Sequence, residues 1–161
     1  MFERATVDFL ESGSALIVAV VDADGMPSAG RAWGLTVVSP DEGRVRLLID
    51  AADDEIVEDA AAGGRIAITG AEVATFRSTQ LKGRVIRVER ASADDDARAA
   101  RFCEDFFAEV TKLDGTPREM LDRLVPDEYV ACEILVDEVF DQTPGPSAGS
   151  AVGGSRGAGD G

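Results

Sequence analysis

The sequence predicts a mainly β domain with flanking helices, in which antiparallel strands close into a small barrel. Five or six runs of apolar and β-branched residues are separated by tight turns, whereas segments with helical periodicity are few. The chain has 161 residues, of which 45% are hydrophobic and 29% charged, so it has the composition of one globular domain that can bury a core. Many short strands with few helices favour a closed barrel over an open sheet.

The first half of the chain supplies most of these strands. Residues 2–12 carry apolar side chains at roughly helical spacing, which predicts a short helix. The run "ALIVAVVD" at 15–22 is continuously apolar, as in a buried strand, and "DADGMP" after it is a strong hairpin signal. Further strands are predicted at 28–38, 44–50, 65–70 and 73–88, and a helix at 53–64, which has acids at its start and glycines at its end.

The second half begins with a change of period. Aromatic and aliphatic residues recur at helical spacing over 93–113, a pattern more typical of core or dimer packing than of ligand contacts. Thr116 and Glu119 form the pattern of a capping box, which predicts the start of a second helix. A closing strand is predicted at 128–140. The folded domain is expected to span 1–143, and the Gly/Ser/Ala/Pro-rich residues 144–161 are predicted to be a disordered tail.

Charge and composition exclude several classes of function. The formal net charge of -15 argues against nucleic acid and anionic lipid as partners. The chain has no histidine, which excludes histidine-based catalysis and the common histidine metal sites. Cys103 and Cys132 are expected to be buried free thiols. The N-terminus lacks the pattern of a signal peptide, and the longest apolar run is too short for a membrane span, so a soluble cytoplasmic protein is expected.

One basic stretch stands out in this acidic chain, the sequence "TFRSTQLKGRV" at 75–85. In an extended strand Ser78, Gln80, Lys82 and Arg84 would share one face, because side chains alternate. This face has two interpretations. It is either a solvated outer strand face or one wall of a site for an anionic ligand.

Three segments together resemble a known family. They are "VDADGMPSAGRAWGLTV", "TFRSTQLKGRVIRVE" and "VDEVFDQTPGP", and they resemble the pyridoxamine 5′-phosphate oxidase-like, FMN-binding split-barrel proteins over roughly residues 11–146. The resemblance implies a six-stranded antiparallel split β-barrel. It also implies a homodimer with FMN as the cofactor, bound in two sites at the dimer interface that both chains build.

The resemblance further implies which residues bind the cofactor. Gln80 falls where the family has a flavin-contacting glutamine, with Ser78 and Lys82 on the same face. Arg31 keeps the leading arginine of a flavin-binding strand, but Thr36 stands where the family has a lysine. Trp33, the only tryptophan, would share a face with Arg31, and it would serve either core or dimer packing or stacking on the ligand.

The chain also departs from the family pattern. Where the oxidases place a basic phosphate cluster, it has Asp53, Asp54 and Glu55. A phosphate would then depend on Arg31 and backbone donors, with help from Thr36 or Lys82; otherwise the site binds FMN weakly or holds something else. The missing histidine argues against true pyridoxamine phosphate oxidase activity and against haem.

Four functions follow from these features. The sequence favours a flavin-dependent oxidoreductase. The alternatives are a deazaflavin-dependent reductase, a non-catalytic flavin- or ligand-binding split-barrel dimer, and an interaction protein that uses its acidic surface. The sequence indicates no catalytic residue.

Overall fold

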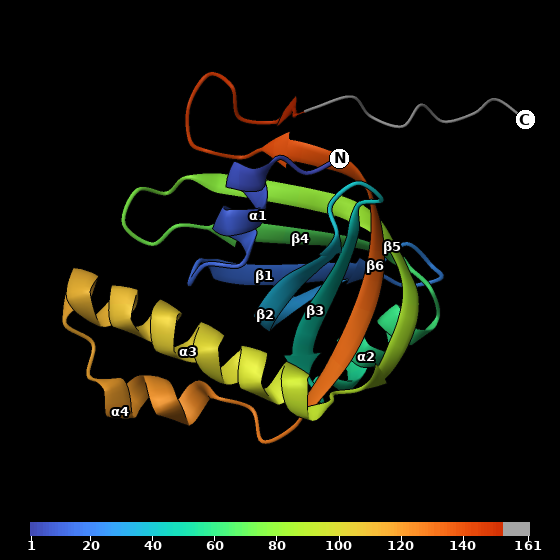
Figure 1. Cartoon of the computed structure of the whole chain (residues 1–161). Coiled ribbons are helices and arrows are strands. Elements are labelled where there is room, and N and C mark those ends of the chain that lie inside the picture. Colours follow the sequence, from blue (N-terminus) through green and yellow to red (C-terminus); the bar gives the residue numbers. More distant parts are fainter. Residues whose placement is uncertain (153–161) are drawn as a thin grey trace, which may run out of the picture.

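The structure is a computed structural model that describes residues 1–152 (Figure 1). The helices are α1 (Arg4–Leu10), α2 (Asp54–Ala61), α3 (Ala93–Asp114), α4 (Arg118–Leu121) and the 3-10 turn η1 (Asp122–Leu124). The strands are β1 (Ala15–Val21), β2 (Pro27–Ser39), β3 (Arg44–Asp50), β4 (Arg65–Ala71), β5 (Ser78–Arg90), β6 (Tyr129–Asp141) and β7 (Ser150–Ala151). No helix of this part of the chain is long and apolar enough to cross a membrane.

The strands form a closed, six-stranded antiparallel barrel, which confirms the predicted fold class. Their order is β3-β2-β1-β4-β5-β6, and β6 pairs with β3 to close the ring. The long strands β2, β5 and β6 each pair with neighbours on both sides. Register shifts interrupt β2 between Ala32 and Leu35 and β5 at Lys82/Gly83. Such bulges bend a strand and increase its twist, which lets a long strand curve around the barrel.

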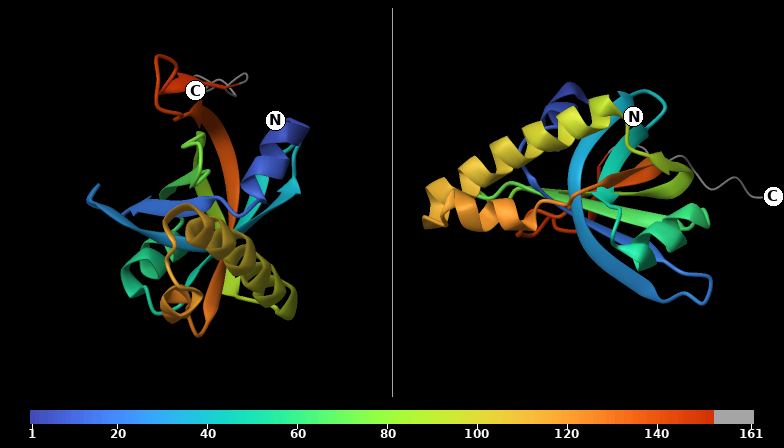
Figure 2. Two further views of the ribbon diagram at one scale, coloured as in Figure 1. Left: turned by 90° about the vertical axis from the view of Figure 1, so that its left-hand side faces the viewer. Right: turned by 90° about the horizontal axis from the view of Figure 1, so that it is seen from below.

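The helices cover the barrel from outside, and α3 contributes the largest aromatic group to the core. Phe102, Phe106 and Phe107 are buried, and the rings of Phe102 and Phe106 stack with centroids 5.5 Å apart. Figure 2 shows α3 lying across one side of the barrel and α2 on another. The helical spacing of aromatics in the sequence therefore serves core packing.

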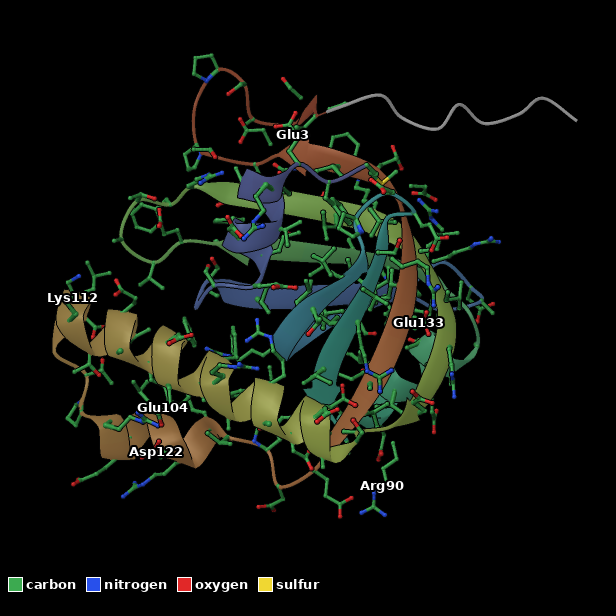
Figure 3. All side chains as sticks on the ribbon, in the orientation of Figure 1. Glu3, Arg90, Glu104, Lys112, Asp122 and Glu133 are labelled. Atoms are coloured by element: carbon green, nitrogen blue, oxygen red, sulfur yellow. The ribbon has the colours of Figure 1, made fainter. Side chains whose placement is uncertain are left out.

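Helix α4 is fastened to α3 by one arginine. Arg118 donates to both carboxylate oxygens of Glu104, at 3.0 and 2.6 Å, and to Asp122 at 2.6 Å. Its guanidinium also lies 5.3 Å from the centre of the Phe107 ring. Figure 3 labels Glu104 of α3 and Asp122 of η1, the two acids that bind Arg118.

The start of α4 differs from the prediction. The hydroxyl and backbone N–H of Thr116 are both bound by the carboxylate of Asp114, so Thr116 caps no helix. The helix begins after Pro117 and lasts one turn. The capping box of this structure is at the start of α3, where Ser92 accepts from the Asp95 N–H and Asp95 accepts from the Ser92 N–H. The capping box predicted at Thr116 is wrong because a nearer acceptor captures its hydroxyl.

Two boundaries also differ. Strand β5 begins at Ser78 rather than at 73, because residues 73–77 form the β4–β5 loop, in which Phe76 has a φ of 60°. Residues 144–152, predicted to be disordered, form a turn and the short strand β7, which pairs with Phe140 and Asp141. Main-chain hydrogen bonds hold this segment, and composition does not reveal them. The rest of the predicted tail lies outside the described residues.

Candidate functional site

Four strands align one row of side chains across the outer face of the barrel. Gln80 of β5 lies opposite Thr69 of β4, Thr69 lies opposite Ile17 of β1, and Ile17 lies opposite Arg31 of β2. Opposite residues in an antiparallel pair point to the same face. Gln80 and Arg31 are three strands apart, a span of about 14 Å at the usual strand spacing. Two of the predicted site residues therefore lie at opposite ends of one row.

The Gln80 end of the row is a polar cluster. The Gln80 amide donates to the Thr69 hydroxyl at 3.1 Å, and its oxygen accepts from the Gln142 amide at 3.5 Å. Lys82, two residues along the same face, has its ammonium 4.7 Å from the centre of the Phe140 ring. This end of the row thus combines neutral donors and acceptors with one cation. Thr69, Phe140 and Gln142 were not predicted as site residues, because strand register rather than a sequence pattern places them beside Gln80 and Lys82.

The middle of the face is apolar and exposed. Ile17 is 47% exposed and Val21 37%, and they alternate with the half-buried Ala19. A shallow hollow of about 200 Å³ lies beside them, lined by Ala19, Val21, Arg65, Ile66, Ala67 and Lys82. The sequence predicted a buried strand here, but only alternate residues of β1 face the core. The outward-facing residues of β1 are apolar as well, so the apolar run in the sequence did not reveal that one of its faces is exposed.

Three of the strands that form this face carry no acid, although the protein is strongly acidic. The strands β1, β2 and β4 contain no aspartate or glutamate, although the chain has 31 acids among 161 residues. The charged residues on these strands are Arg31 and Arg65. Arg65 is already paired with Asp137 of β6. Charge repulsion therefore does not prevent a neutral ligand or another protein surface from approaching here.

The Arg31 end of the row has a different character. Arg31 is exposed and forms no hydrogen bond or ion pair within residues 1–152. Arg31 lines a small hollow with Ile17, Trp33 and Phe102. On the opposite face of β2, the Asp53 carboxylate lies against Gly30, where a Cβ would be 2.7 Å from its Oδ2. The Arg31 end of the row therefore offers a cation beside apolar side chains.

Known structures were compared with this geometry. No protein-family model and no curated protein matches the chain. Among solved structures, HupZ of Group A Streptococcus matches with a TM-score of 0.56 and 17% identity, covering 92% of this chain and all of that one. A putative pyridoxamine 5′-phosphate oxidase from Lactobacillus delbrueckii matches with a TM-score of 0.51 and 20% identity over 86% and 93% of the two chains. An F420 reductase matches with a TM-score of 0.53 and 12% identity over 86% and 98%.

These matches, together with the closed barrel, decide the fold. The chain has the pyridoxamine 5′-phosphate oxidase-like split-barrel fold. The resemblance found in the sequence is confirmed at this level.

Trp33 is buried in the split barrel close to Arg31. Its side chain is 4% exposed and belongs to the main hydrophobic cluster, whereas Arg31 is exposed. Both residues line one small hollow together with Ile17 of β1 and with Phe102 and Phe106 of α3. Beyond Trp33 a bulge interrupts β2, where Gly34 has a φ of 146°, a conformation that glycine tolerates. Of the two roles considered for Trp33, the structure favours packing.

Thr36 lies in a separate polar pocket of the split barrel. The pocket has a volume of about 280 Å³ and is lined by Glu11, Thr36, Arg98, Arg101 and Asp105. Arg98 holds the local backbone, donating to Leu35 O at 2.9 Å and to Glu11 O at 2.8 Å. Burial lowers the pKa of Arg98 from its ordinary value. Thr36 therefore does not join the row from Arg31 to Gln80.

Ser78 serves the β4–β5 loop. It is buried, its hydroxyl donates to Phe76 O at 2.8 Å, and its N–H donates to the Thr143 hydroxyl at 3.0 Å. It shares the Gln80 strand, but local contacts already occupy its hydroxyl and its N–H. Of the six predicted residues, the structure brings Arg31, Gln80 and Lys82 to one outer face and places Thr36 in a separate pocket. Ser78 is buried two residues before Gln80 on β5, and Trp33 is buried beside Arg31.

The thiols lie away from this face. Cys103 and Cys132 are buried and free, as the sequence predicted. Burial raises the pKa of Cys132 to about 12 and raises the pKa of Cys103 as well, so both stay protonated near neutral pH. In the described part of the chain, no group of acids and cysteines could hold a metal ion.

Proposed function

We propose that this protein binds a flavin-type cofactor on the outer face of β2, β1, β4 and β5 and acts as a flavin-dependent oxidoreductase. The observation that carries the proposal is the row Arg31–Ile17–Thr69–Gln80. A bound flavin would supply the electron and hydride chemistry, so the protein needs to bind and orient it. The fold shared with a putative pyridoxamine 5′-phosphate oxidase and with an F420 reductase supports a ligand of this kind.

The residues at the Gln80 end fit the ring of a flavin. The Gln80 amide can both donate to and accept from the pyrimidine edge, and Gln142 and Thr69 hold that amide in place. Lys82 could stabilise negative charge near the reduced ring. The neighbouring Ala19 and Ala67 have small side chains, so a planar ring can lie flat on the sheet.

The same face leads us to propose a homodimer. A flavin ring bound on an open sheet would stay exposed to solvent on one side. Beside it, the exposed side chains of Ile17 and Val21 form an apolar strip. A second copy of the chain would cover both. The absence of acids from β1, β2 and β4 removes the repulsion that two chains of charge -15 would otherwise meet there.

Flavin binding tests the proposal directly. Purified protein, or protein given riboflavin or FMN, should show flavin absorbance bands and quench flavin fluorescence. Gln80→Ala should weaken binding of both flavins about tenfold, because it removes the amide that would form hydrogen bonds with the pyrimidine edge of the ring. Arg87→Ala, an exposed change farther along the same strand, should leave binding unchanged. If neither flavin binds to wild-type protein, the proposal is wrong.

A second candidate is a flavin-binding protein without catalytic activity. The Arg31 end of the row favours it, because a phosphate needs several donors or cations to replace its water and Arg31 is the cation that this end supplies. Steady turnover with a nicotinamide donor and an electron acceptor would exclude this candidate. Turnover only with a deazaflavin would instead assign the protein as a deazaflavin-dependent reductase.

A further inference from the structure

We infer that Gln142 is a positioning residue of this site: it fixes the direction in which Gln80 presents its amide, so that the site selects a ring with an unsubstituted imide edge. The inference rests on the proposed function and deepens it. An imide edge is a ring N–H between two carbonyl groups, and it forms the pyrimidine edge of flavins and deazaflavins alike. Gln142 comes from the segment that follows β6.

Hydrogen bonds on both sides of Gln142 hold it beside the start of β5. Gln142 N donates to Ser78 O at 2.9 Å, and Ser78 N donates to the Thr143 hydroxyl at 3.0 Å. The carboxylate of Asp141 accepts from Thr143 N at 2.8 Å, and the main-chain oxygen of Asp141 accepts from Gly149 N at 2.7 Å. The turn after β6 therefore folds back on the strand, and the fold itself fixes the position of Gln142.

Both ends of the Gln80 amide have a partner within the protein. Gln80 Nε2 donates to the Thr69 hydroxyl at 3.1 Å, and Gln80 Oε1 accepts from Gln142 Nε2 at 3.5 Å. A hydroxyl can accept or donate, so Thr69 would suit the Gln80 amide in either of its two directions. The amide N–H of Gln142 suits only the direction in which the Gln80 oxygen faces it. Gln142 therefore sets the direction of the Gln80 amide.

The held amide leaves one donor and one acceptor for a ligand. With one contact made at each end, Gln80 keeps one N–H of Nε2 and one lone pair of Oε1. These two groups lie side by side and match one carbonyl and the adjoining N–H of an imide. Gln80, Thr69 and Gln142 are half-buried. A ring without the imide N–H would leave Gln80 Oε1 short of a hydrogen bond under the bound ligand, where water cannot replace it.

Methylated flavins test the selection. A methyl group on the imide nitrogen removes the N–H and changes neither the charge nor the side chain of the ligand. In fluorescence titrations, riboflavin or FMN should bind wild-type protein about tenfold more tightly than its own 3-methyl derivative. Equal affinities would overturn the inference and leave the proposed function standing. Binding of neither riboflavin nor FMN would overturn both.

Two substitutions of Gln142 test the direction of the amide. Gln142→Lys offers only donors, so it can still donate to Gln80 Oε1 and should keep the preference for the unmethylated flavin. Gln142→Glu offers only acceptors, so it should draw the Gln80 N–H toward itself, turn the amide round and reduce the affinity ratio to about one. The ratio compares two ligands of equal charge, so the charge that each substitution adds cancels. A ratio kept in both variants, or lost in both, would contradict the role of Gln142.

A double-mutant cycle separates positioning from direct contact. Gln142→Ala should weaken flavin binding severalfold in the wild-type background and change nothing in a Gln80→Ala background, because Gln142 acts through Gln80. Arg87→Ala, farther along β5, is the matched control and should leave binding unchanged in both backgrounds. Equal losses from Gln142→Ala in the two backgrounds would show that Gln142 contacts the ligand itself or only supports the fold, and would overturn the inference.

Discussion

Arg46 of β3 and Asp95 of α3 form a bidentate ion pair that fastens the start of the longest helix to the barrel. Arg46 Nε lies 2.7 Å from Asp95 Oδ1, and Nη2 lies 2.7 Å from Oδ2. Glu89 of β5 accepts a third hydrogen bond from Arg46, at 2.8 Å. Asp95 also accepts from the backbone and hydroxyl of Ser92, so one carboxylate serves both the ion pair and the helix cap.

This pair predicts a pH-dependent stability. Asp95→Asn should lower the free energy of unfolding at pH 7 on the order of 2 kcal/mol, because charged hydrogen bonds in a mostly buried site are lost. The Arg46 guanidinium holds the pKa of Asp95 well below its ordinary value, so the stabilisation is present above about pH 4 to 5 and is lost as pH falls toward the folded-state pKa. In urea melts, the gap between wild type and Asp95→Asn should therefore shrink from pH 7 to pH 3. Asp94→Asn, an exposed change in the same turn, should cost only about a few tenths of a kcal/mol. A gap that does not change with pH would contradict this account.

The proposed dimer can be tested at Ile17. Ile17→Glu places a charge in the centre of the apolar strip and should convert the dimer to monomers, as measured by light scattering after size exclusion. Flavin binding should weaken with it, because the ring would lose its cover. Val38→Glu is a matched control, since Val38 is also 47% exposed but lies at the far end of β2. A monomeric wild type, or equal behaviour of the two variants, would argue against this interface.

The β4–β5 loop contains a strained residue. Phe76 has a φ of 60°, is 64% exposed, and is the one non-glycine residue with positive φ among residues 1–152. Phe76→Asn should raise the free energy of unfolding by about 1 kcal/mol, because asparagine adopts this conformation at lower cost. Ala74→Asn in the same loop should bring no gain. A stability loss in the urea melt of Phe76→Asn would show that the exposed ring makes a stabilising contact.

Close backbone approach at Gly83 predicts a large loss on adding one methyl group. A Cβ there would lie 2.3 Å from the carbonyl oxygen of Leu135, so β5 and β6 would have to separate at their bulge. Gly83→Ala should destabilise the protein by about 2 kcal/mol or more. Gly70→Ala on β4, whose Cβ would meet its nearest neighbour at 3.4 Å, should cost much less. Similar thermal midpoints for the two variants would contradict the close approach.

The barrel was predictable because strong turn signals in the sequence separate its strands. Asp22, for example, binds the backbone of Asp24 and Met26 in the turn that the Asp-Gly pair predicted. The site was only half predictable. Alternation placed Gln80 and Lys82 on one face, but it could not show that Phe102 and Phe106 of α3 lie beside Trp33, which is buried.

Other features lie beyond the reach of periodicity. The outward face of β1 was hidden, since an apolar run looks the same whether one or both faces are buried. The partners of Gln80 were hidden too, because Thr69 and Gln142 reach it through strand pairing rather than through a sequence pattern. The Thr116 hydroxyl binds the Asp114 carboxylate instead of capping a helix. That choice depends on the loop conformation near Asp114, which a capping-box pattern in the sequence does not encode.

The seam between β3 and β6 has a consequence for how the protein is made. It joins residues 44–50 to residues 129–135, so a nascent chain cannot close the ring until its last long strand has left the ribosome. Pairing across such a large sequence separation is slow, on a scale of milliseconds to seconds, and until then β3 and β5 present unpaired edges. We expect a translation product that stops before Tyr129 to need chaperone protection, and the arrival of β6 to be the step that commits the chain to its native state.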